Sequence, residues 1–560
     1  MKSTIRRGNV MKRLNSDLLL ALAMSALLML GPASAATVTG PVTCVPEGKE
    51  DPNQAWVVCT PADDLAAGFI PLPIPHNSLR YEIISEGVAA ISDKSLSKPS
   101  IKTDYVEEEF FIEGTAEMFT SATPLTADGM WNVQKASGGA APYKIRILVR
   151  RPADPNKFNG TVVLEFGHVS NSEYGFVFMR DEIFNGGYAY VLVSPLAGAG
   201  NGQVDGLKFY DPTRYASLHV PGIWVDYGYD MFTQAAKEIR NPSPGSVDPM
   251  GGLQVERIIA TGHSYGAQVL GTYVNAVQPL EGLIDGFLPT DIAGSFSLNI
   301  SEGIFTPPYP FYNKIRSDLS NAKVIRLNSE WSLMDNAVPD SNNVPEQPFL
   351  GIEWGTRVRQ PDSDSYRGYE YSGGAHVNRD HYTRFGYVGW NSLQDTIDFL
   401  LFGTCLTEGN DGIATNQVHN AVLYQLNEWI RTGNPAPASV QMPIVVVDAV
   451  NGYVDFERDA VGNPLGGIRP VAIDVPIARY DGRWEADPSP SLLPIFDGSC
   501  NQSGVKVPLD QAKLDELYKN HGDYVFKVVS SARDLESTGF LRPYDEKKIV
   551  DAAAQSDIGK

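Results

Sequence analysis

Several short runs in this sequence are apolar on both faces of an extended strand, and they constrain the fold more than any other feature. They are rich in β-branched residues, are bounded by polar residues or glycine, and occupy 161–166, 188–194, 257–261 and 323–327. Strands of this kind are typical of a parallel sheet that helices cover on both faces. Helical periodicity occurs at 229–239, 266–277 and 416–431. Because strands alternate with helices, the sequence predicts an α/β fold with a doubly wound, mostly parallel sheet.

The rest of the chain is arranged around this predicted core. Residues 36–135 mix short strand-like runs with proline and glycine, whereas 143–149 alternates like a strand with one solvated face. We expect 36–135 to form a β-rich segment packed on the core and 136–435 to form the core with cap insertions. Residues 436–560 then form a C-terminal extension of the same domain. A chain of 560 residues with 43% hydrophobic residues is long enough to bury a large core.

Residues 1–35 have the pattern of a secretory signal peptide. Basic residues between Lys2 and Arg13 precede the apolar stretch Leu18–Leu30, and Ala33-Ser34-Ala35 supplies an A-x-A cleavage pattern. We expect cleavage before Ala36 and export of the mature protein to the periplasm or the extracellular medium. The apolar stretch is short for a membrane span, and no later run approaches about 18 apolar residues, so no membrane span is expected.

The cysteine content agrees with export. The chain has four cysteines, Cys44, Cys59, Cys405 and Cys500. An even number in an oxidising compartment favours disulfide bonds, and three pairings are possible. We prefer Cys44–Cys59 and Cys405–Cys500, which join neighbours in sequence.

The charge balance limits the possible partners. Lys and Arg number 45 and Asp and Glu number 66, which gives a net charge of −21. Such a surface repels phosphate backbones and anionic lipid headgroups, so binding to nucleic acid or to a membrane surface is disfavoured. A small-molecule partner is expected, and the oligomeric state is left open.

A candidate nucleophile lies in Gly262-His263-Ser264-Tyr265-Gly266. The pattern G-x-S-x-G places its serine on a strained turn between a strand and a helix, where side chains in place of the glycines would collide. The pattern alone can arise by chance, so its context decides. The run 257–261 leads directly into it, and 267–274 leaves it with helical spacing. The sequence therefore predicts Ser264 as a nucleophile.

A serine hydroxyl becomes nucleophilic when an imidazole accepts its proton and a carboxylate orients that imidazole. After a nucleophile of this kind, the acid and then the histidine follow along the chain. His376 follows a strand-like run and a glycine-rich loop, so it is the favoured base, with His381 as the fallback. His419 lies inside a predicted helix, and His521 lies in the charged C-terminal region. His376 and His381 could also be two metal ligands, but no third ligand suggests itself and no metal is expected.

The acid is less clearly defined. The run 323–327 leads through Asn328-Ser329 to Glu330, which places a carboxylate just beyond a predicted strand. Glu330 is therefore the preferred acid. Asp335 is its rival, and other acids such as Asp291 stay open as candidates.

These segments resemble the α/β-hydrolase superfamily, and most closely a bacterial group described only as α/β-hydrolase domain proteins. The matching segments cover most of the mature chain and include 211–215, 229–232, 249–253, 328–330, 374–376 and 462–470. Many members carry Glu-Ser-Gln-Ser-Ala at the turn where this chain has His263-Ser264-Tyr265-Gly266-Ala267. The resemblance implies the α/β-hydrolase fold with cap or lid insertions and an acyl-enzyme mechanism without cofactor or metal, but no particular substrate.

An oxyanion hole needs two backbone N–H groups that point at the developing negative oxygen. In this fold one comes from the residue after the nucleophile, here Tyr265. The other comes from the loop after 161–166, and we favour the N–H of His168 or Val169.

Together these features predict an exported serine hydrolase that cleaves carboxylic esters through an acyl-enzyme. An amidase or acyltransferase would use the same residues, and a catalytically silent binding protein could keep the same fold. The aromatic residues Trp224, Tyr309, Phe311 and Trp331 could cap the site or pack in the core. Dehalogenase and epoxide-hydrolase chemistry is disfavoured because the turn carries serine and not aspartate.

Overall fold

The computed structural model describes residues 69–72, 105–137, 139–168, 173–196, 203–210, 212–223, 225–244, 246–291, 294–298, 313–333, 355–377, 415–448, 453–482 and 504–560. The predicted signal peptide and all four cysteines lie outside these residues, so export and the disulfide pairing stay predictions. None of the described helices is both long and apolar enough to cross a membrane.

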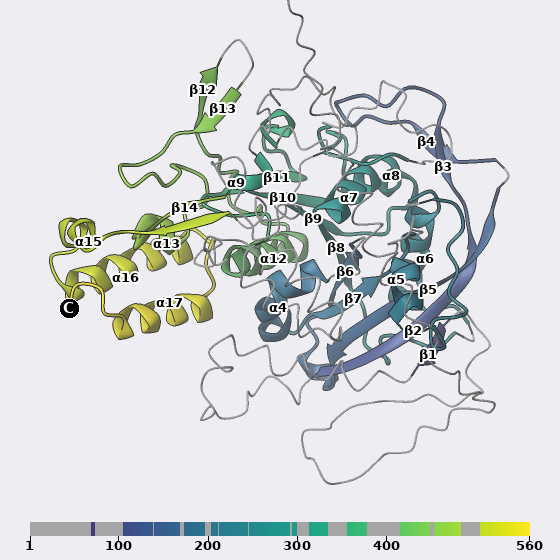
Figure 1. Ribbon diagram of the computed structural model, residues 1–560. Coiled ribbons are helices and arrows are strands. Elements are labelled where there is room, and N and C mark those ends of the chain that lie inside the picture. The colour runs from purple at the N-terminus through teal and green to yellow at the C-terminus, as the bar shows by residue number, and fades with distance from the viewer. Residues whose placement is uncertain are drawn as a thin grey trace, which may run out of the picture. The chain divides into compact units, whose positions relative to one another are not determined.

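A nine-stranded sheet forms the centre of the described structure, in the order β1-β2-β5-β7-β6-β8-β9-β10-β11 (Figure 1). Strands β6 to β11 run parallel to one another, whereas β1, β2 and β5 pair antiparallel with their neighbours. The predicted doubly wound, mostly parallel sheet is thus confirmed. The strands are β1 (Phe69–Leu72), β2 (Tyr105–Ala116), β5 (Ala141–Pro152), β6 (Thr161–Phe166), β7 (Ala189–Val193), β8 (Arg257–His263), β9 (Gly286–Thr290), β10 (Lys323–Ser329) and β11 (Tyr366–Tyr371).

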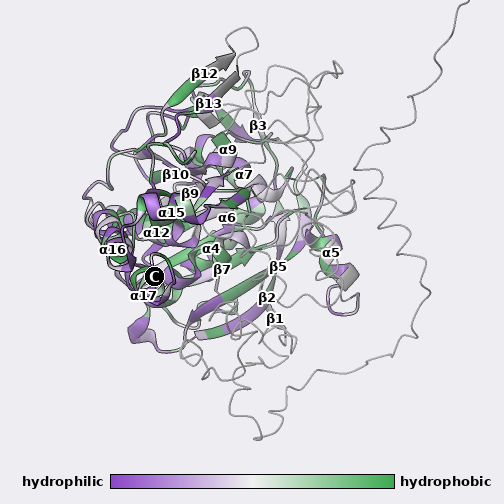
Figure 2. Ribbon diagram, turned by 60° about the vertical axis from the view of Figure 1, so that its left-hand side comes forward, coloured by the Kyte–Doolittle hydropathy of each residue, from purple (hydrophilic) through white to green (hydrophobic). Residues whose placement is uncertain are grey.

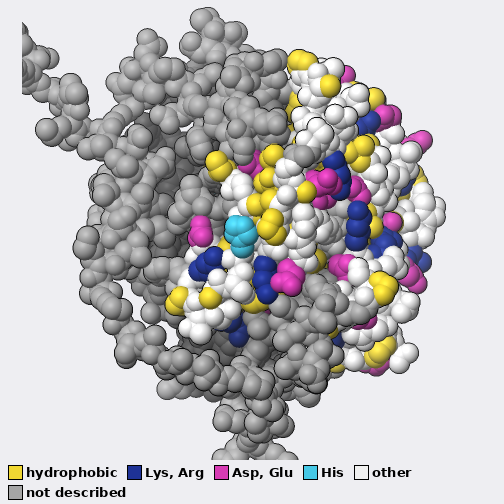
Figure 3. All heavy atoms as spheres, turned by 90° about the vertical axis from the view of Figure 1, so that its right-hand side faces the viewer, with side chains coloured by type: hydrophobic (Ala, Val, Ile, Leu, Met, Phe, Trp, Pro, Cys, Tyr) yellow, Lys and Arg dark blue, Asp and Glu magenta, His cyan; other side chains and the backbone are white. Residues whose placement is uncertain are grey.

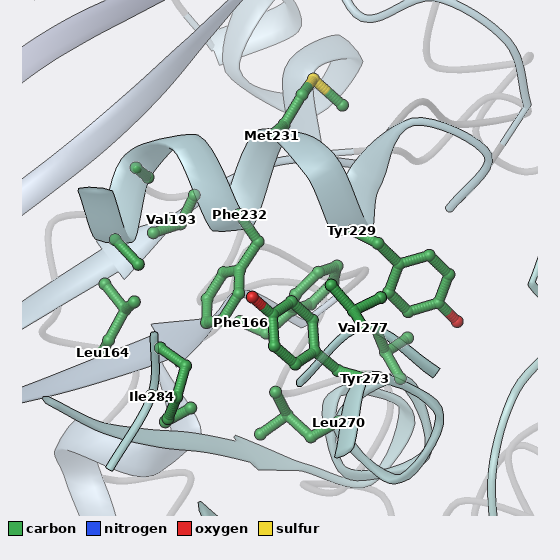
Figure 4. Packing of buried hydrophobic residues seen from close by; sticks show 14 of the residues in the cluster. Leu164, Phe166, Val193, Tyr229, Met231, Phe232, Leu270, Tyr273, Val277 and Ile284 are labelled. Atoms are coloured by element: carbon green, nitrogen blue, oxygen red, sulfur yellow. The ribbon is translucent and has the colours of Figure 1, made fainter. Parts of the chain in front are cut away.

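Helices cover both faces of this sheet because side chains alternate between the faces along each strand. On β6, Val162, Leu164 and Phe166 belong to an apolar cluster with α6 (Gly228–Arg240) and α7 (Tyr265–Ala276), part of which Figure 4 shows. Val163 belongs to a second cluster, with α4 (Tyr174–Gly186) and α12 (Thr415–Thr432), on the opposite face. The helices predicted at 229–239, 266–277 and 416–431 are therefore confirmed.

Strands β2 and β9 of the sheet were not predicted from the sequence. Strand β9 contains Gly286 and Pro289, residues that usually mark turns and not central strands. Strand β2 contains the acidic run 107–109, which is typical of a solvated surface. In the structure Glu107, Glu108 and Glu109 form ion pairs with Arg150, Arg151 and Arg146 of β5, so this run is held against the sheet. On the face that carries β2 and β5, acidic and basic side chains lie close together (Figure 3).

The described residues of the C-terminal part add short strands and four helices. Hydrophilic residues are prominent on α17, whereas strands such as β7 are mostly hydrophobic (Figure 2). Helix α17 is fixed to α4 because the Glu182 carboxylate accepts hydrogen bonds from Arg542 Nε (2.9 Å) and Tyr544 Oη (2.9 Å). The remaining elements are β3 (Phe119–Ser121), β4 (Val133–Lys135), α5 (Gln203–Tyr210), α8 (Gln278–Glu281), α9 (Glu330–Leu333), β12 (Ile444–Asp448), β13 (Tyr453–Phe456), α13 (Val471–Asp474), β14 (Ala478–Asp481), β15 (Val505–Pro508), α15 (Gln511–Leu517), α16 (His521–Ser537) and α17 (Pro543–Gln555).

The close packing of α7 on the segment that follows β9 can be tested by a substitution at Gly271. In a free helix alanine is more stable than glycine by about 1 kcal/mol. Here a Cβ at Gly271 would lie 2.4 Å from the carbonyl oxygen of Gly294. We expect Gly271→Ala to lower the free energy of unfolding by about 1–3 kcal/mol, as overpacking does.

The measurement is the thermal midpoint of each variant, followed by far-UV circular dichroism. Gly522→Ala on α16 is the control, because a Cβ there would contact only Asn520 Oδ1, at 3.2 Å. An increase in the midpoint of Gly271→Ala would show that α7 is not packed as described.

Candidate active site

The turn between β8 and α7 has the geometry that the sequence predicts. Ser264 sits on it with φ 55° and ψ −118°, a backbone conformation that non-glycine residues rarely adopt. Its N–H donates a hydrogen bond to the carbonyl of Thr290 at the end of β9 (3.0 Å). The flanking glycines are required by close backbone contacts, since a Cβ on Gly262 would lie 2.7 Å from the carbonyl carbon of Gly266. The turn thus holds the Ser264 hydroxyl at the carboxyl edge of the sheet.

A chain of two hydrogen bonds connects Ser264 to a buried carboxylate. His376 Nε2 lies 3.0 Å from Ser264 Oγ, and His376 Nδ1 lies 3.0 Å from Asp291 Oδ2. A carboxylate accepts hydrogen bonds, so Nδ1 carries the proton and Nε2 is left to accept the proton of the serine hydroxyl. This arrangement can activate a serine nucleophile.

Asp291 comes directly after β9 and is itself firmly held. Its Oδ1 accepts a hydrogen bond from the N–H of Ser329 at the end of β10 (2.9 Å), and its own N–H donates to the carbonyl of Leu327 (2.8 Å). Its backbone has φ 60°, which aspartate tolerates better than most residues. The side chain is fully buried. Asp291 is therefore oriented toward His376 by backbone groups of the neighbouring strand.

The prediction that Glu330 orients the histidine is wrong. The Glu330 carboxylate accepts hydrogen bonds from Arg458 Nη2 (2.7 Å) and from the N–H groups of Gly373 (3.0 Å) and Gly482 (3.1 Å). Burial alone would lower the pKa of Arg458, but the Glu330 and Asp481 carboxylates raise it above its usual range. Glu330 thus forms an ion pair with Arg458 and does not orient His376. Its rival Asp335 and the alternative base His381 lie outside the described residues.

Two rings pack against the imidazole of His376. The Trp331 ring lies 4.2 Å from it, centroid to centroid, and the His263 ring lies 4.8 Å from it in a stacked arrangement. His263 Nε2 donates a hydrogen bond to the main-chain carbonyl of His376 (3.1 Å), and Nδ1 lies 3.2 Å from the hydroxyl of Thr290. The role of His263 was missed, although it stands inside the serine motif. Of the aromatic residues that could cap the site or pack in the core, Trp331 contacts His376, and Trp224, Tyr309 and Phe311 lie outside the described residues.

The predicted oxyanion loop connects β6 to α4. Hydrogen bonds hold the described residues at both ends of this loop. The carbonyl of His168 accepts a hydrogen bond from Gln203 Nε2 (2.9 Å). At the other end, where α4 starts, the N–H groups of Gly175 (2.9 Å) and Phe176 (3.1 Å) donate hydrogen bonds to the Glu165 carboxylate of β6. The N–H of Gly167 donates to the carbonyl of Val193, so it is already engaged.

The oxyanion assignments themselves stay predictions. Tyr265, the residue after the candidate nucleophile, is the first residue of α7. Val169 lies outside the described residues, and His168 is the last described residue before the gap. Burial, with the charge of His376 as a second cause, lowers the pKa of His168 to about 3, so its imidazole is neutral at neutral pH.

His263, Asp291 and His376 also offer three ligand atoms within 4.8 Å of one another, a grouping that could hold a metal ion. Asp291 Oδ2 accepts a hydrogen bond from His376 Nδ1, and His263 Nε2 donates to the His376 carbonyl. In the structure these atoms are hydrogen-bonded to one another, to Ser264 and to a main-chain carbonyl, as in a proton-transfer site.

Comparison with known proteins agrees with this fold. The family model described as alpha/beta hydrolase domain matches residues 70–551. The chain belongs to the α/β-hydrolase family. As a member of this family, it is expected to act on a small molecule. No curated protein matches the sequence.

Solved structures of α/β hydrolases are similar to this chain at low identity. A protein described as a dienelactone hydrolase of Klebsiella pneumoniae is 15% identical over 52% of this chain and 95% of its own, with a TM-score of 0.25. A serine hydrolase without a lid from Xanthomonas campestris is 9% identical over 39% of this chain and 71% of its own (TM-score 0.20). A fungal esterase from Rhizomucor miehei is 12% identical over 39% of this chain and 66% of its own (TM-score 0.22).

The different surroundings of Glu330 and Asp291 lead to a stability prediction. Glu330→Gln leaves Arg458 beside an uncharged amide that cannot accept all three hydrogen bonds. Breaking a buried ion pair in this way typically costs about 3–5 kcal/mol, so we expect the free energy of unfolding to fall by about 3 kcal/mol. Asp291→Asn should lower it far less, because the Asn oxygen still accepts from Ser329.

Chemical denaturation of both variants, followed by tryptophan fluorescence, provides the comparison. Equal losses of stability in the two variants would contradict the assignment of the ion pair to Glu330.

Proposed function

We propose that this protein is a serine hydrolase that cleaves carboxylic esters through an acyl-enzyme. The observation that carries the proposal is the chain of hydrogen bonds Ser264–His376–Asp291, in which Ser264 lies on the strained turn between β8 and α7. This geometry supports nucleophilic attack by the serine in a family whose fold positions it for that purpose. No cofactor has a role in the proposed reaction.

The reaction follows from the positions of three side chains. Ser264 Oγ attacks the ester carbonyl carbon while His376 Nε2 accepts its proton. The bond between this carbon and the alkoxy oxygen then breaks, as the same proton moves to the leaving oxygen. Asp291 stabilises the imidazolium that forms in between. The N–H of Tyr265 and an N–H of the loop beginning at His168 are proposed to stabilise the oxyanion. Water, deprotonated by His376, then releases the acid and restores Ser264.

The nucleophile can be tested with a fluorophosphonate probe, which reacts only with an activated serine. We expect the wild-type protein to be labelled on the peptide that contains Ser264. Ser264→Ala should be unlabelled and should hydrolyse p-nitrophenyl acetate at least about 10⁴-fold more slowly, because loss of the serine removes the acyl-enzyme route. Unlabelled wild-type protein would instead indicate a catalytically silent binding protein.

The acid can be tested by isosteric substitution. Asp291→Asn keeps the size of the side chain but allows the wrong tautomer of His376, so we expect kcat for p-nitrophenyl acetate to fall by about a thousandfold or more. Steady-state kinetics of the two purified proteins provide the values. A kcat within tenfold of wild type would show that Asp291 is not the acid of this site.

A further inference from the structure

Glu330 is the first residue of α9, directly after β10, and its carboxylate accepts a hydrogen bond from the loop that carries His376 and not from the imidazole. Its side chain is fully buried. One carboxylate oxygen accepts from Arg458 Nη2, and the other accepts from the N–H groups of Gly373 and Gly482. Glu330 therefore joins three segments that lie far apart in the sequence.

The next residue holds the same loop by a second route. The N–H of Trp331 donates a hydrogen bond to the carbonyl of Gly374 (3.1 Å), and the Trp331 ring contacts the His376 ring. Gly373 and Gly374 stand only three and two residues before His376. The turn at 330–331 thus fixes the backbone of the loop and confines the imidazole at its end.

The C-terminal part of the chain supports the loop from the other side. Gly482 packs so closely that a Cβ there would lie 2.3 Å from the carbonyl oxygen of Gly374 and 2.8 Å from Glu330 Cβ. The Ser372 N–H donates to the carbonyl of Ile468 (2.9 Å), and its hydroxyl donates to the carbonyl of Gly466 (2.7 Å). Arg458 belongs to this same part of the chain and donates to the carbonyl of Gly462 (3.2 Å).

We propose that Glu330 and Arg458 are positioning residues for His376, and that the segment 455–482 is thereby a structural part of the active site. The ion pair neutralises a buried carboxylate while leaving it free to accept the two backbone N–H groups that hold the loop. The proposal rests on the proposed function, because the position of His376 matters for catalysis only if His376 is the base. A misplacement of about 1 Å can lower a rate about 100-fold.

The test compares Glu330→Gln with wild type in two assays. We expect kcat for p-nitrophenyl acetate and the second-order rate of fluorophosphonate labelling of Ser264 each to fall about 100-fold, because both need His376 in place. KM should stay within about threefold, since Glu330 faces the loop backbone. Arg458→Lys, which keeps a cation beside Glu330, should retain more of both rates than Arg458→Gln.

Glu182→Gln is the matched control for lost stability. Glu182 is also a buried carboxylate paired with a C-terminal arginine, Arg542, but it lies on α4 and its side-chain partners lie at the start of α17 and not on the loop of His376. It should lower the thermal midpoint yet leave kcat and the labelling rate within about threefold. A loss of rate in Glu182→Gln equal to that in Glu330→Gln would show that the effect is general destabilisation and would overturn the proposal.

Gly482→Ala perturbs the packing of the His376 loop from the C-terminal part of the chain. This variant replaces Glu330→Gln in the test if Glu330→Gln does not fold. Its Cβ collides with Gly374, so we expect kcat to fall at least tenfold with KM little changed. An unchanged kcat would contradict the proposal.

If wild-type protein is labelled and Glu330→Gln is labelled equally fast, only the positioning role fails. If wild-type protein is not labelled, the serine-hydrolase proposal fails, and the positioning role falls with it.

Discussion

The hydrogen bond between His376 Nδ1 and Asp291 Oδ2 is the contact on which the proposed site depends. It joins the residue after β9 to a loop after β11, two strands that are separated in the sheet by β10. Strand β10 makes the contact possible, because the N–H of Ser329 at its end holds the other oxygen of Asp291. The nucleophile is fixed to the same edge, since the N–H of Ser264 donates to Thr290 on β9. Parallel strands with a common carboxyl edge thus bring three distant residues together.

The carboxyl ends of two neighbouring strands carry carboxylates with different roles. Asp291 faces the imidazole, whereas Glu330 faces a guanidinium and two backbone N–H groups. The different roles of Asp291 and Glu330 follow from the groups that surround each carboxylate. They do not follow from the number of residues between each carboxylate and His376. A carboxylate that is surrounded by donors of this kind can hold a loop, but it does not accept a hydrogen bond from the imidazole of His376.

Much of the fold could be predicted from the sequence because it depends on local patterns. Strands β6, β7, β8 and β10 are apolar on both faces, and only a sheet covered by helices on both sides accommodates such strands. The turn at Ser264 was predicted because glycine is required at Gly262 and Gly266. The acid was not, because β9 contains glycine and proline and was not recognised as a strand, so Asp291 did not stand out as a residue at a strand end. Long-range contacts, such as that of Arg458 with Glu330, leave no local pattern.

A crystal structure of the protein after reaction with diisopropyl fluorophosphate tests the central claim most directly. The account predicts a phosphoryl group bonded to Ser264 Oγ, with a phosphoryl oxygen within hydrogen-bonding distance of the N–H of Tyr265. It also predicts that Asp291 Oδ2 stays within hydrogen-bonding distance of His376 Nδ1. Phosphorylation of another residue, or a carboxylate other than Asp291 on His376, would contradict it.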